Sequence, residues 1–235
     1  MAKNKNKKAD SGTDILESPD LLREQLSKTE QYFERNKTLY FSILGIITIG
    51  LVGFFMFRYY LSSQNEKAQV DMFQAIYYYE SDSLDKALLG DGNNYGFIDI
   101  IDNYSMTKAA NLAHFYAGAT YLKKSEYDNA IEHLMKFKAD DVAIQARTYA
   151  LIGDANMEKT EYTEAAKYYL KASEFKPNEF LSPQYLEKAA VAFEKLKDYE
   201  SAGDCYNQII EKYRTANEYQ NALKHKARLD GLAKK

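Results

Sequence analysis

Residues 153–178 read GDANMEKTEYTEAAKYYLKASEFKPN, and this stretch decides the fold. Small residues alternate here with large aromatic residues at regular intervals, and the stretch closes on Pro177. An ordinary amphipathic helix buries a wide stripe of large apolar side chains. Small residues at fixed positions indicate instead that two helix backbones come close together there.

The same spacing occurs in two other segments. GATYLKKSEYDNAIEHLMKF starts at Gly118, and AVAFEKLKDYESAGDCYNQI starts at Ala190. In each copy the first residue is followed nine positions later by a Tyr, then three positions later by an Ala, and then by a large residue. These are Tyr127, Tyr162 and Tyr199, then Ala130, Ala165 and Ala202, then Leu134, Tyr169 and Tyr206. The chain therefore carries an internal repeat.

Each copy is predicted to form two helices joined by a tight turn. In the first copy, helix A runs roughly from Leu112 to Lys123 and helix B from Tyr127 to Lys136. The small first residue lies in the middle of helix A, where a Gly costs ~1 kcal/mol relative to Ala. This cost is understandable if helix B crosses there. Pro177 is predicted to end a helix B, because the residue before a Pro is disfavoured in the helical region.

This pattern resembles the tetratricopeptide repeat, in which a small residue, aromatic residues, an Ala and a closing Pro recur every ~34 residues. The resemblance covers residues 109–213. It departs from the family pattern at His114, which replaces a large apolar residue, and at Asn156, which replaces an aromatic residue. It implies an α-solenoid of helical hairpins that binds other proteins.

The flanks are predicted to complete the array. Residues 66–108 form a divergent first repeat, interrupted by a loop at GDGNNYG (residues 90–96), and residues 214–235 form the polar capping helix that such arrays need. Residues 66–103 carry eight acidic residues against Lys67 and Lys86, and residues 205–235 carry seven basic residues against three acidic ones. We interpret both regions as ordinary solvated surfaces.

The segment from Thr38 to Phe57, TLYFSILGIITIGLVGFFMF, contains 20 residues without a charge. At ~1.5 Å per residue, such a helix spans the ~30 Å hydrocarbon core of a membrane. The sequence predicts a disordered tail over 1–17, a short amphipathic helix over 18–37, a transmembrane helix over 38–58 and a polar connection over 62–69. Lys and Arg are more frequent before the span than after it, which favours a cytoplasmic N-terminus and a translocated C-terminal domain.

The fold class that follows is all-α, with one transmembrane helix before an α-solenoid. No constellation of residues indicates catalysis, a cofactor, a metal ion or a small-molecule substrate. His114, His133 and His225 are scattered along the chain, and the single Cys205 is interpreted as a small buried apolar residue. A net charge of -3 argues against nucleic-acid binding. The protein is therefore predicted to bind proteins and not to be an enzyme.

The resemblance implies a partner-binding groove lined by helix A. Its residues are Leu112, Phe115, Ala119 and Leu122 in the first unit, Arg147, Ala150, Asp154 and Met157 in the second, and Gln184, Glu187, Val191 and Glu194 in the third. Family members that clamp a chaperone's terminal carboxylate place Lys, Asn and Arg at such positions, so a mixed apolar and acidic groove is expected here. In an alternative interpretation, Leu112, Phe115 and Leu122 pack against the first repeat.

The layout of anchor and array also resembles a bacterial inner-membrane family that is ancillary to the Sec translocon. This resemblance implies a periplasmic repeat domain that acts as a scaffold or co-chaperone, with translocon subunits and a periplasmic chaperone as partners. Two alternatives remain open. One is an assembly subunit of another envelope complex for secretion or motility, and the other is an organellar import receptor with a cytosolic repeat domain.

Overall fold

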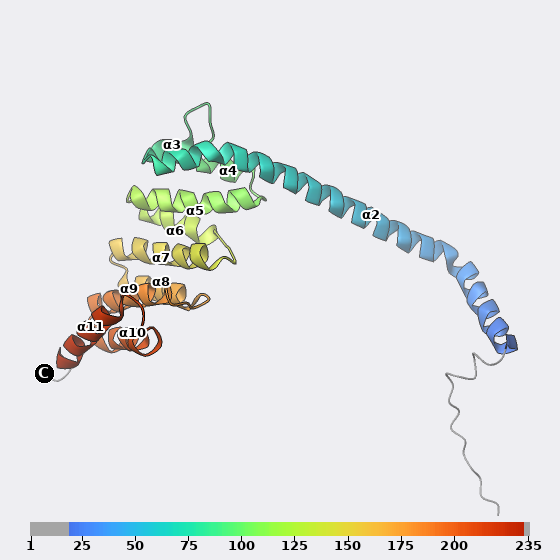
Figure 1. The fold of residues 1–235 in the computed structure, drawn as a ribbon. Helices are drawn as coiled ribbons and strands as arrows, with labels where there is room; N and C mark the ends of the chain where they lie inside the picture. Colours follow the sequence, from blue (N-terminus) through green and yellow to red (C-terminus); the bar gives the residue numbers. More distant parts are fainter. Residues whose placement is uncertain (1–18, 233–235) are drawn as a thin grey trace, which may run out of the picture. The chain divides into compact units, whose positions relative to one another are not determined.

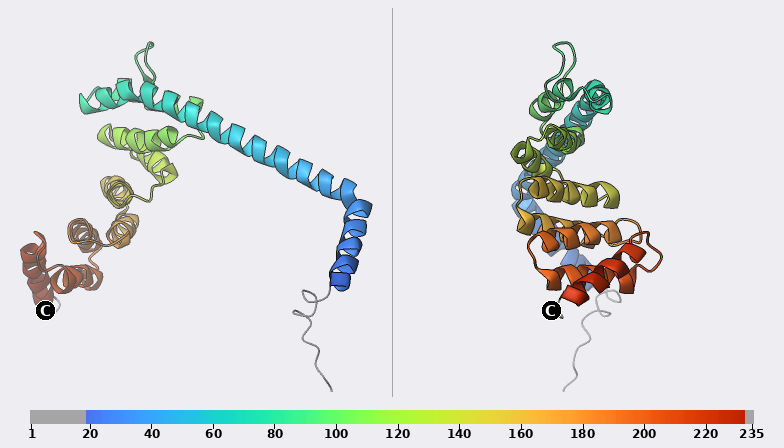
Figure 2. Two further views of the ribbon diagram at one scale, coloured as in Figure 1. Left: turned by 45° about the vertical axis from the view of Figure 1, so that its right-hand side comes forward. Right: turned by 90° about the vertical axis from the view of Figure 1, so that its left-hand side faces the viewer.

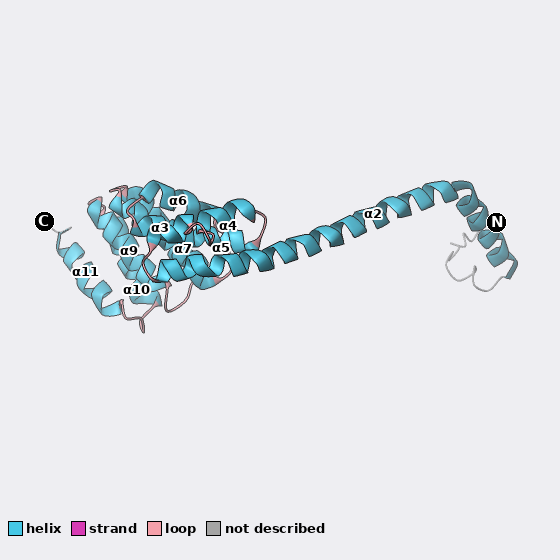
Figure 3. Ribbon diagram, turned by 90° about the horizontal axis from the view of Figure 1, so that it is seen from above, coloured by secondary structure: helices cyan, strands magenta, loops and turns pink. Residues whose placement is uncertain are grey.

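The computed structural model describes residues 19–232, which form helices joined by turns and loops (Figure 1). In the described part of the chain there is no strand, as the colouring of Figure 3 makes plain. The chain divides into two compact units, one up to Tyr59 and one from Tyr60 onward. Helical hairpins make up most of the second unit.

Helix α2 is one unbroken helix, Pro19–Glu80. In the first unit its large apolar side chains are exposed, for example Ile46 at 72% and Ile49 at 74%. The predicted polar connection over residues 62–69 is helical and continues α2. The segment is polar but contains neither Gly nor Pro, and polarity alone does not end a helix. The predicted tail over 1–17 lies outside the described residues.

Four hairpins follow one another in the second unit. The last part of α2 pairs with α3 (Leu84–Leu89) and α4 (Phe97–Asn103), and three regular hairpins and a final helix come after them. These helices are α5 (Lys108–Lys123), α6 (Tyr127–Lys136), α7 (Val142–Glu158), α8 (Tyr162–Glu174), α9 (Ser182–Lys195), α10 (Tyr199–Lys212) and α11 (Tyr219–Leu232). Figure 2 shows the hairpins stacked in chain order.

The turn inside each hairpin has the same geometry. Its central residue has a positive φ of 58° to 61°, although none of the four is a Gly. These residues are Asp82, Ser125, Thr160 and Lys197. The next residue donates its backbone N–H to the carbonyl five positions earlier, at 2.8 to 3.0 Å, which closes the preceding helix as in a Schellman motif. The turn between α2 and α3 therefore has the same geometry as the turns inside the three regular hairpins.

The small residues of the repeat lie where helix A meets helix B. A Cβ added at Gly118 would come within 2.5 Å of Leu134 Cγ, and one added at Gly153 would come within 2.6 Å of the Tyr169 ring. Ala190 is fully buried at the matching position of the third hairpin. The predicted close approach of the two helices is therefore present in the structure.

Helix boundaries agree with most of the sequence signals. Helix α8 ends at Glu174, three residues before Pro177, as that proline predicts. Helix α5 begins at Lys108, one turn earlier than the repeat pattern indicated, because the Thr107 hydroxyl accepts a hydrogen bond from Ala110 N at 3.1 Å and caps the helix. The GDGNNYG segment is a loop between α3 and α4, where Gly90 has a φ of +76°.

Candidate protein-binding surface

Helix A of the first regular hairpin, α5, contributes little free surface. Phe115 is only 9% exposed and packs in a cluster with Leu134, Phe137 and Ile152. The Phe115 and Phe137 ring centroids are 5.5 Å apart. Ala119 is buried as well, so both residues belong to the core of the hairpin.

The other two candidates on α5 are half-buried. Leu112 packs against the core of the divergent first repeat and also against the Phe115 cluster. Leu122 is half-buried near the end of the helix. Leu112 therefore packs against the first repeat, as in the alternative interpretation, whereas Phe115 packs against Leu134, Phe137 and Ile152.

Helix α7 provides the central polar groups of the surface. Arg147 is exposed, whereas Ala150 is buried and Met157 is half-buried against the C-terminal core. Asp154 Oδ1 accepts hydrogen bonds from the Tyr169 hydroxyl and from Lys188 Nζ, both at 2.7 Å. Asp154 and Lys188 therefore form an ion pair that joins α7 to α9 on a half-exposed surface.

The charge of Arg147 affects the pKa of a tyrosine on each of the two helices beside α7. Burial raises the pKa of Tyr116 on α5 and that of Tyr185 on α9, and in both cases the Arg147 charge opposes the increase. Together with the ion pair between Asp154 and Lys188, Arg147 forms a polar strip across α7 and α9. Tyr116, Tyr185 and Lys188 were missed by sequence reasoning, since they lie outside the positions that line the groove in the family.

The two acidic candidates of α9 contact the final helix, α11. Glu194 pairs with Arg228 of α11 and accepts a hydrogen bond from the Tyr206 hydroxyl at 3.0 Å. Burial raises the pKa of Glu187, and a hydrogen bond with Asn221 of α11 opposes this effect. These carboxylates thus stabilise the contact with α11. Of the α9 candidates, only Gln184 and Val191 are exposed.

Two of the histidines, far apart in the sequence, meet between α5 and α6. The Nδ1 atoms of His114 and His133 are 3.0 Å apart, and the Tyr121 ring lies 5.4 Å from that of His133. Burial, helped by the His133 and Lys136 charges, lowers the pKa of His114 to about 4, and burial also lowers that of His133. Both rings are therefore neutral near pH 7. The two histidines are 19 residues apart, at positions of helices A and B that face each other. This separation could have predicted their contact.

Cys205 is buried on α10. Burial is the main reason that its pKa rises to about 12. The thiol is therefore protonated and shielded at neutral pH, which agrees with its interpretation as a small apolar core residue. Within residues 19–232, no group of three His, Cys, Asp or Glu residues could hold a metal ion.

Comparison with known proteins supports the repeat assignment. A family model described as a tetratricopeptide repeat matches residues 146–179, which span most of α7, all of α8 and the loop after it. No curated protein matches the chain. The match includes most of the hairpin that contributes Arg147 and Asp154. Tetratricopeptide repeats serve as protein-interaction scaffolds, and the chain contains such a repeat within an all-α array.

Proposed function

We propose that this protein is a membrane-anchored tetratricopeptide scaffold that binds partner proteins at the periplasmic face of a bacterial inner membrane, as an ancillary subunit of the Sec translocon. The observation that carries the proposal is the combination of a hairpin array with a helix whose exposed apolar segment is long enough to cross a membrane. The array provides the binding surface, and the helix provides the anchor.

Exposure of the apolar segment supports the anchor. By length and composition α2 can span a membrane, and no part of its most apolar stretch is buried. A core helix of a soluble protein can be equally long and apolar, but its apolar side chains are covered by neighbouring elements. Leaving so much apolar surface in water would be unfavourable by ~25 cal/mol for each Å². Lipid is the environment that suits this segment.

Partner binding is assigned to the polar strip of Arg147, Asp154 and Lys188 with the neighbouring Gln184 and Val191. Arg147 is exposed and has no ion-pair partner among the described residues. Its planar guanidinium can bind a carboxylate through two hydrogen bonds. The strip is therefore suited to an extended or helical segment that carries an acidic side chain beside apolar ones.

Orientation can be tested by labelling single cysteines, because the only native thiol is buried. We would compare Ser11→Cys, before the span, with Asn93→Cys, in the exposed loop between α3 and α4. In intact spheroplasts, an impermeant maleimide should label Asn93→Cys and leave Ser11→Cys unlabelled until the membrane is opened. The reverse pattern would refute a periplasmic array, and labelling of both would refute the anchor. The parent chain controls for labelling of Cys205.

A further inference from the structure

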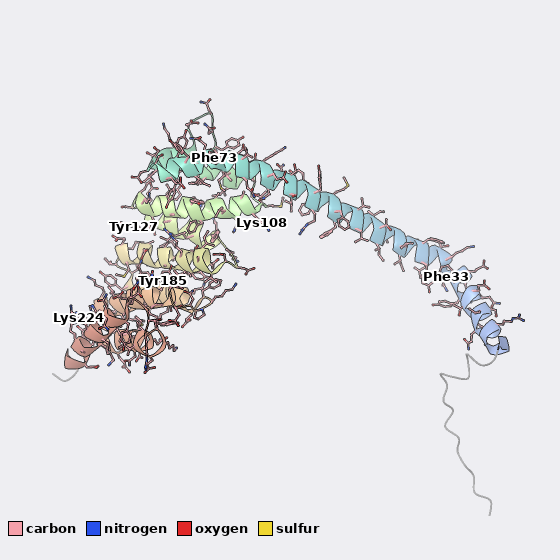
Figure 4. All side chains as sticks on the ribbon, viewed as in Figure 1. Phe33, Phe73, Lys108, Tyr127, Tyr185 and Lys224 are labelled. Atoms are coloured by element: carbon pink, nitrogen blue, oxygen red, sulfur yellow. The ribbon has the colours of Figure 1, made fainter. Side chains whose placement is uncertain are left out.

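A second exposed apolar surface lies on α2, within residues 60–80 of the second unit. Val70, Phe73 and Tyr77 are 75%, 72% and 58% exposed. Their spacing of three and four residues places them in one stripe along the helix. Figure 4 labels Phe73 at one end of the stack of hairpins, with Lys224 of α11 at the other end. We call Val70, Phe73 and Tyr77 the α2 stripe.

The opposite side of the same helix segment is also apolar. Ala68, Met72 and Ala75 are buried in the core of the first hairpin, together with Phe97 and Ile100. Polar residues such as Glu66, Gln69 and Gln74 lie between the two apolar sides. The described residues cover only one of these sides, and an exposed apolar surface such as the α2 stripe can mark an interaction site.

A hollow of about 460 Å³ adjoins the stripe. It is lined by Val70, Asp71, Phe73 and Gln74 of α2 and by Asn93, Asn94, Tyr95 and Tyr104. The hollow is preformed, because its walls are held by hydrogen bonds. The Tyr104 hydroxyl donates to Asp71 Oδ2 at 2.6 Å, and the Tyr78 hydroxyl donates to Asp91 Oδ2 at 2.7 Å.

Asp91 also organises the loop that forms the far wall. Its Oδ1 accepts the backbone N–H groups of Asn93 at 2.9 Å and Asn94 at 2.7 Å. These bonds, with that from Tyr78 as the largest contribution, hold the pKa of Asp91 well below its usual range. Gly90 and Gly96 close the loop, since a Cβ at either position would collide with backbone. The loop is thus built in one conformation beside the stripe.

The charge around this surface is negative. Residues 66–103 hold eight acidic residues against two lysines. Asp82 and Asp85 are paired with lysines of α5 and its C-terminal turn, and the exposed charges on this part of α2 are Glu66 and Glu80 against Lys67. Asp71 and Asp91 add two carboxylates at the hollow. An apolar stripe with an acidic surround is complementary to a segment that combines apolar and basic side chains.

We propose that the α2 stripe is a docking site for a basic amphipathic helix of another protein. The partner's apolar side chains pack on Val70, Phe73 and Tyr77, as in other complexes in which a helix binds an apolar surface, and its lysines or arginines face the surrounding carboxylates. This site is separate from the strip on α7 and α9, and it does not depend on the anchor or its orientation.

Two other occupants fit the surface less well. A second copy of this chain would bring two acidic faces together, and three side chains offer much less than the ~800 Å² per partner of a stable interface. A lipid surface with anionic headgroups would repel the same carboxylates. A basic helix avoids the charge repulsion that both of these occupants would meet.

The test is photo-cross-linking of the full-length chain in detergent micelles, with p-benzoylphenylalanine in place of Phe73. The probe is a synthetic Leu/Lys peptide with amphipathic helical spacing, and a Leu/Glu peptide of the same pattern is the charge control. A second chain carries the photoreactive residue in place of Met135, which is 57% exposed on α6.

The proposal predicts that position 73 forms the Leu/Lys adduct about tenfold more than the Leu/Glu adduct and about tenfold more than position 135 does. In the same photoreactive chain, Val70→Ser combined with Tyr77→Ser should lower the yield to the level of position 135, without unfolding, since both side chains are exposed. Equal yields for the two peptides or the two positions would overturn the proposal. So would products dominated by a chain dimer, which indicate a second copy, or by detergent adducts, which indicate a lipid surface.

Discussion

Leu134 on α6 lies directly against Gly118 on α5, so that a Cβ at Gly118 would stand 2.5 Å from Leu134 Cγ. Gly153 and Tyr169 have the same relationship in the next hairpin, with a closest approach of 2.6 Å. Any other residue at the glycine position would therefore place its Cβ where a large side chain of helix B already lies.

Gly118→Ala should destabilise the protein, although Ala is normally the better helix residue. We expect a loss of about 1–3 kcal/mol, the usual cost of overpacking a core. Gly203→Ala on α10 is the matched control, because its added Cβ would meet only the side chain of Lys226 at 3.8 Å. That variant should gain up to ~1 kcal/mol from helix propensity. Urea denaturation followed by far-ultraviolet circular dichroism measures both, and equal stabilities would contradict the packing described.

Thr160→Gly should stabilise the protein. Thr160 has a φ of +61° in the turn between α7 and α8, and the left-handed region costs a residue with a Cβ about 1–2 kcal/mol. Part of this gain is offset by the greater entropy of Gly in the unfolded chain, so we expect a net gain of about 0.5–1 kcal/mol. Ala227→Gly, on the exposed side of α11, should lose ~1 kcal/mol in the same assay. A loss at both positions would show that the turn does not require the left-handed conformation.

The histidine pair should make stability depend on pH. Burial holds the folded-state pKa values of His114 and His133 below the unfolded value of about 6.5, so their contribution is fully present above that pH and is lost as the pH falls toward 4. Other nearby charges are Lys136, Glu132 and Asp102. Because both rings are only half-buried, solvent screening lowers the expected loss to about 1 kcal/mol.

Comparison of variants isolates this effect from the titration of carboxylates. Denaturation curves at several pH values should show a smaller loss below pH ~6.5 for the double variant His114→Leu with His133→Leu than for the parent chain. His225→Leu is the control for loss of a histidine outside the pair, since His225 stacks on Tyr206 in the C-terminal part of the array. Identical profiles for the parent and the double variant would refute the assignment.

Phe115→Ala should lower stability by about 3–5 kcal/mol, as expected for a phenylalanine in a packed core. Arg147→Glu should leave stability within ~0.5 kcal/mol of the parent, because Arg147 is exposed and makes no described ion pair. Thermal unfolding of the two variants side by side separates the core role from the surface role. A folded Phe115→Ala variant with unchanged stability would show that Phe115 belongs to the partner-binding groove and not to the core.

The hairpins could be predicted because their spacing repeats in register, and the contacts of Gly118 and Gly153 follow from that spacing. The burial of Phe115 could not, since it depends on Phe137, which lies just after α6 and outside the repeat pattern. The contacts of Glu187 and Glu194 with α11 could not be predicted either, because they depend on where α11 packs. The continuity of α2 through residues 62–69 does not follow from their polarity, but it agrees with the absence of Gly and Pro from that segment.

Cross-linking of native membranes, followed by purification of the full-length chain and mass spectrometry of its partners, tests the proposed function most directly. Arg147→Glu, purified in parallel, is the control for binding through the strip. We predict that the parent chain recovers translocon channel subunits and a membrane-anchored periplasmic chaperone, and that the variant recovers them about tenfold less. Recovery of only an outer-membrane or motility complex, or equal recovery by both chains, would contradict the account.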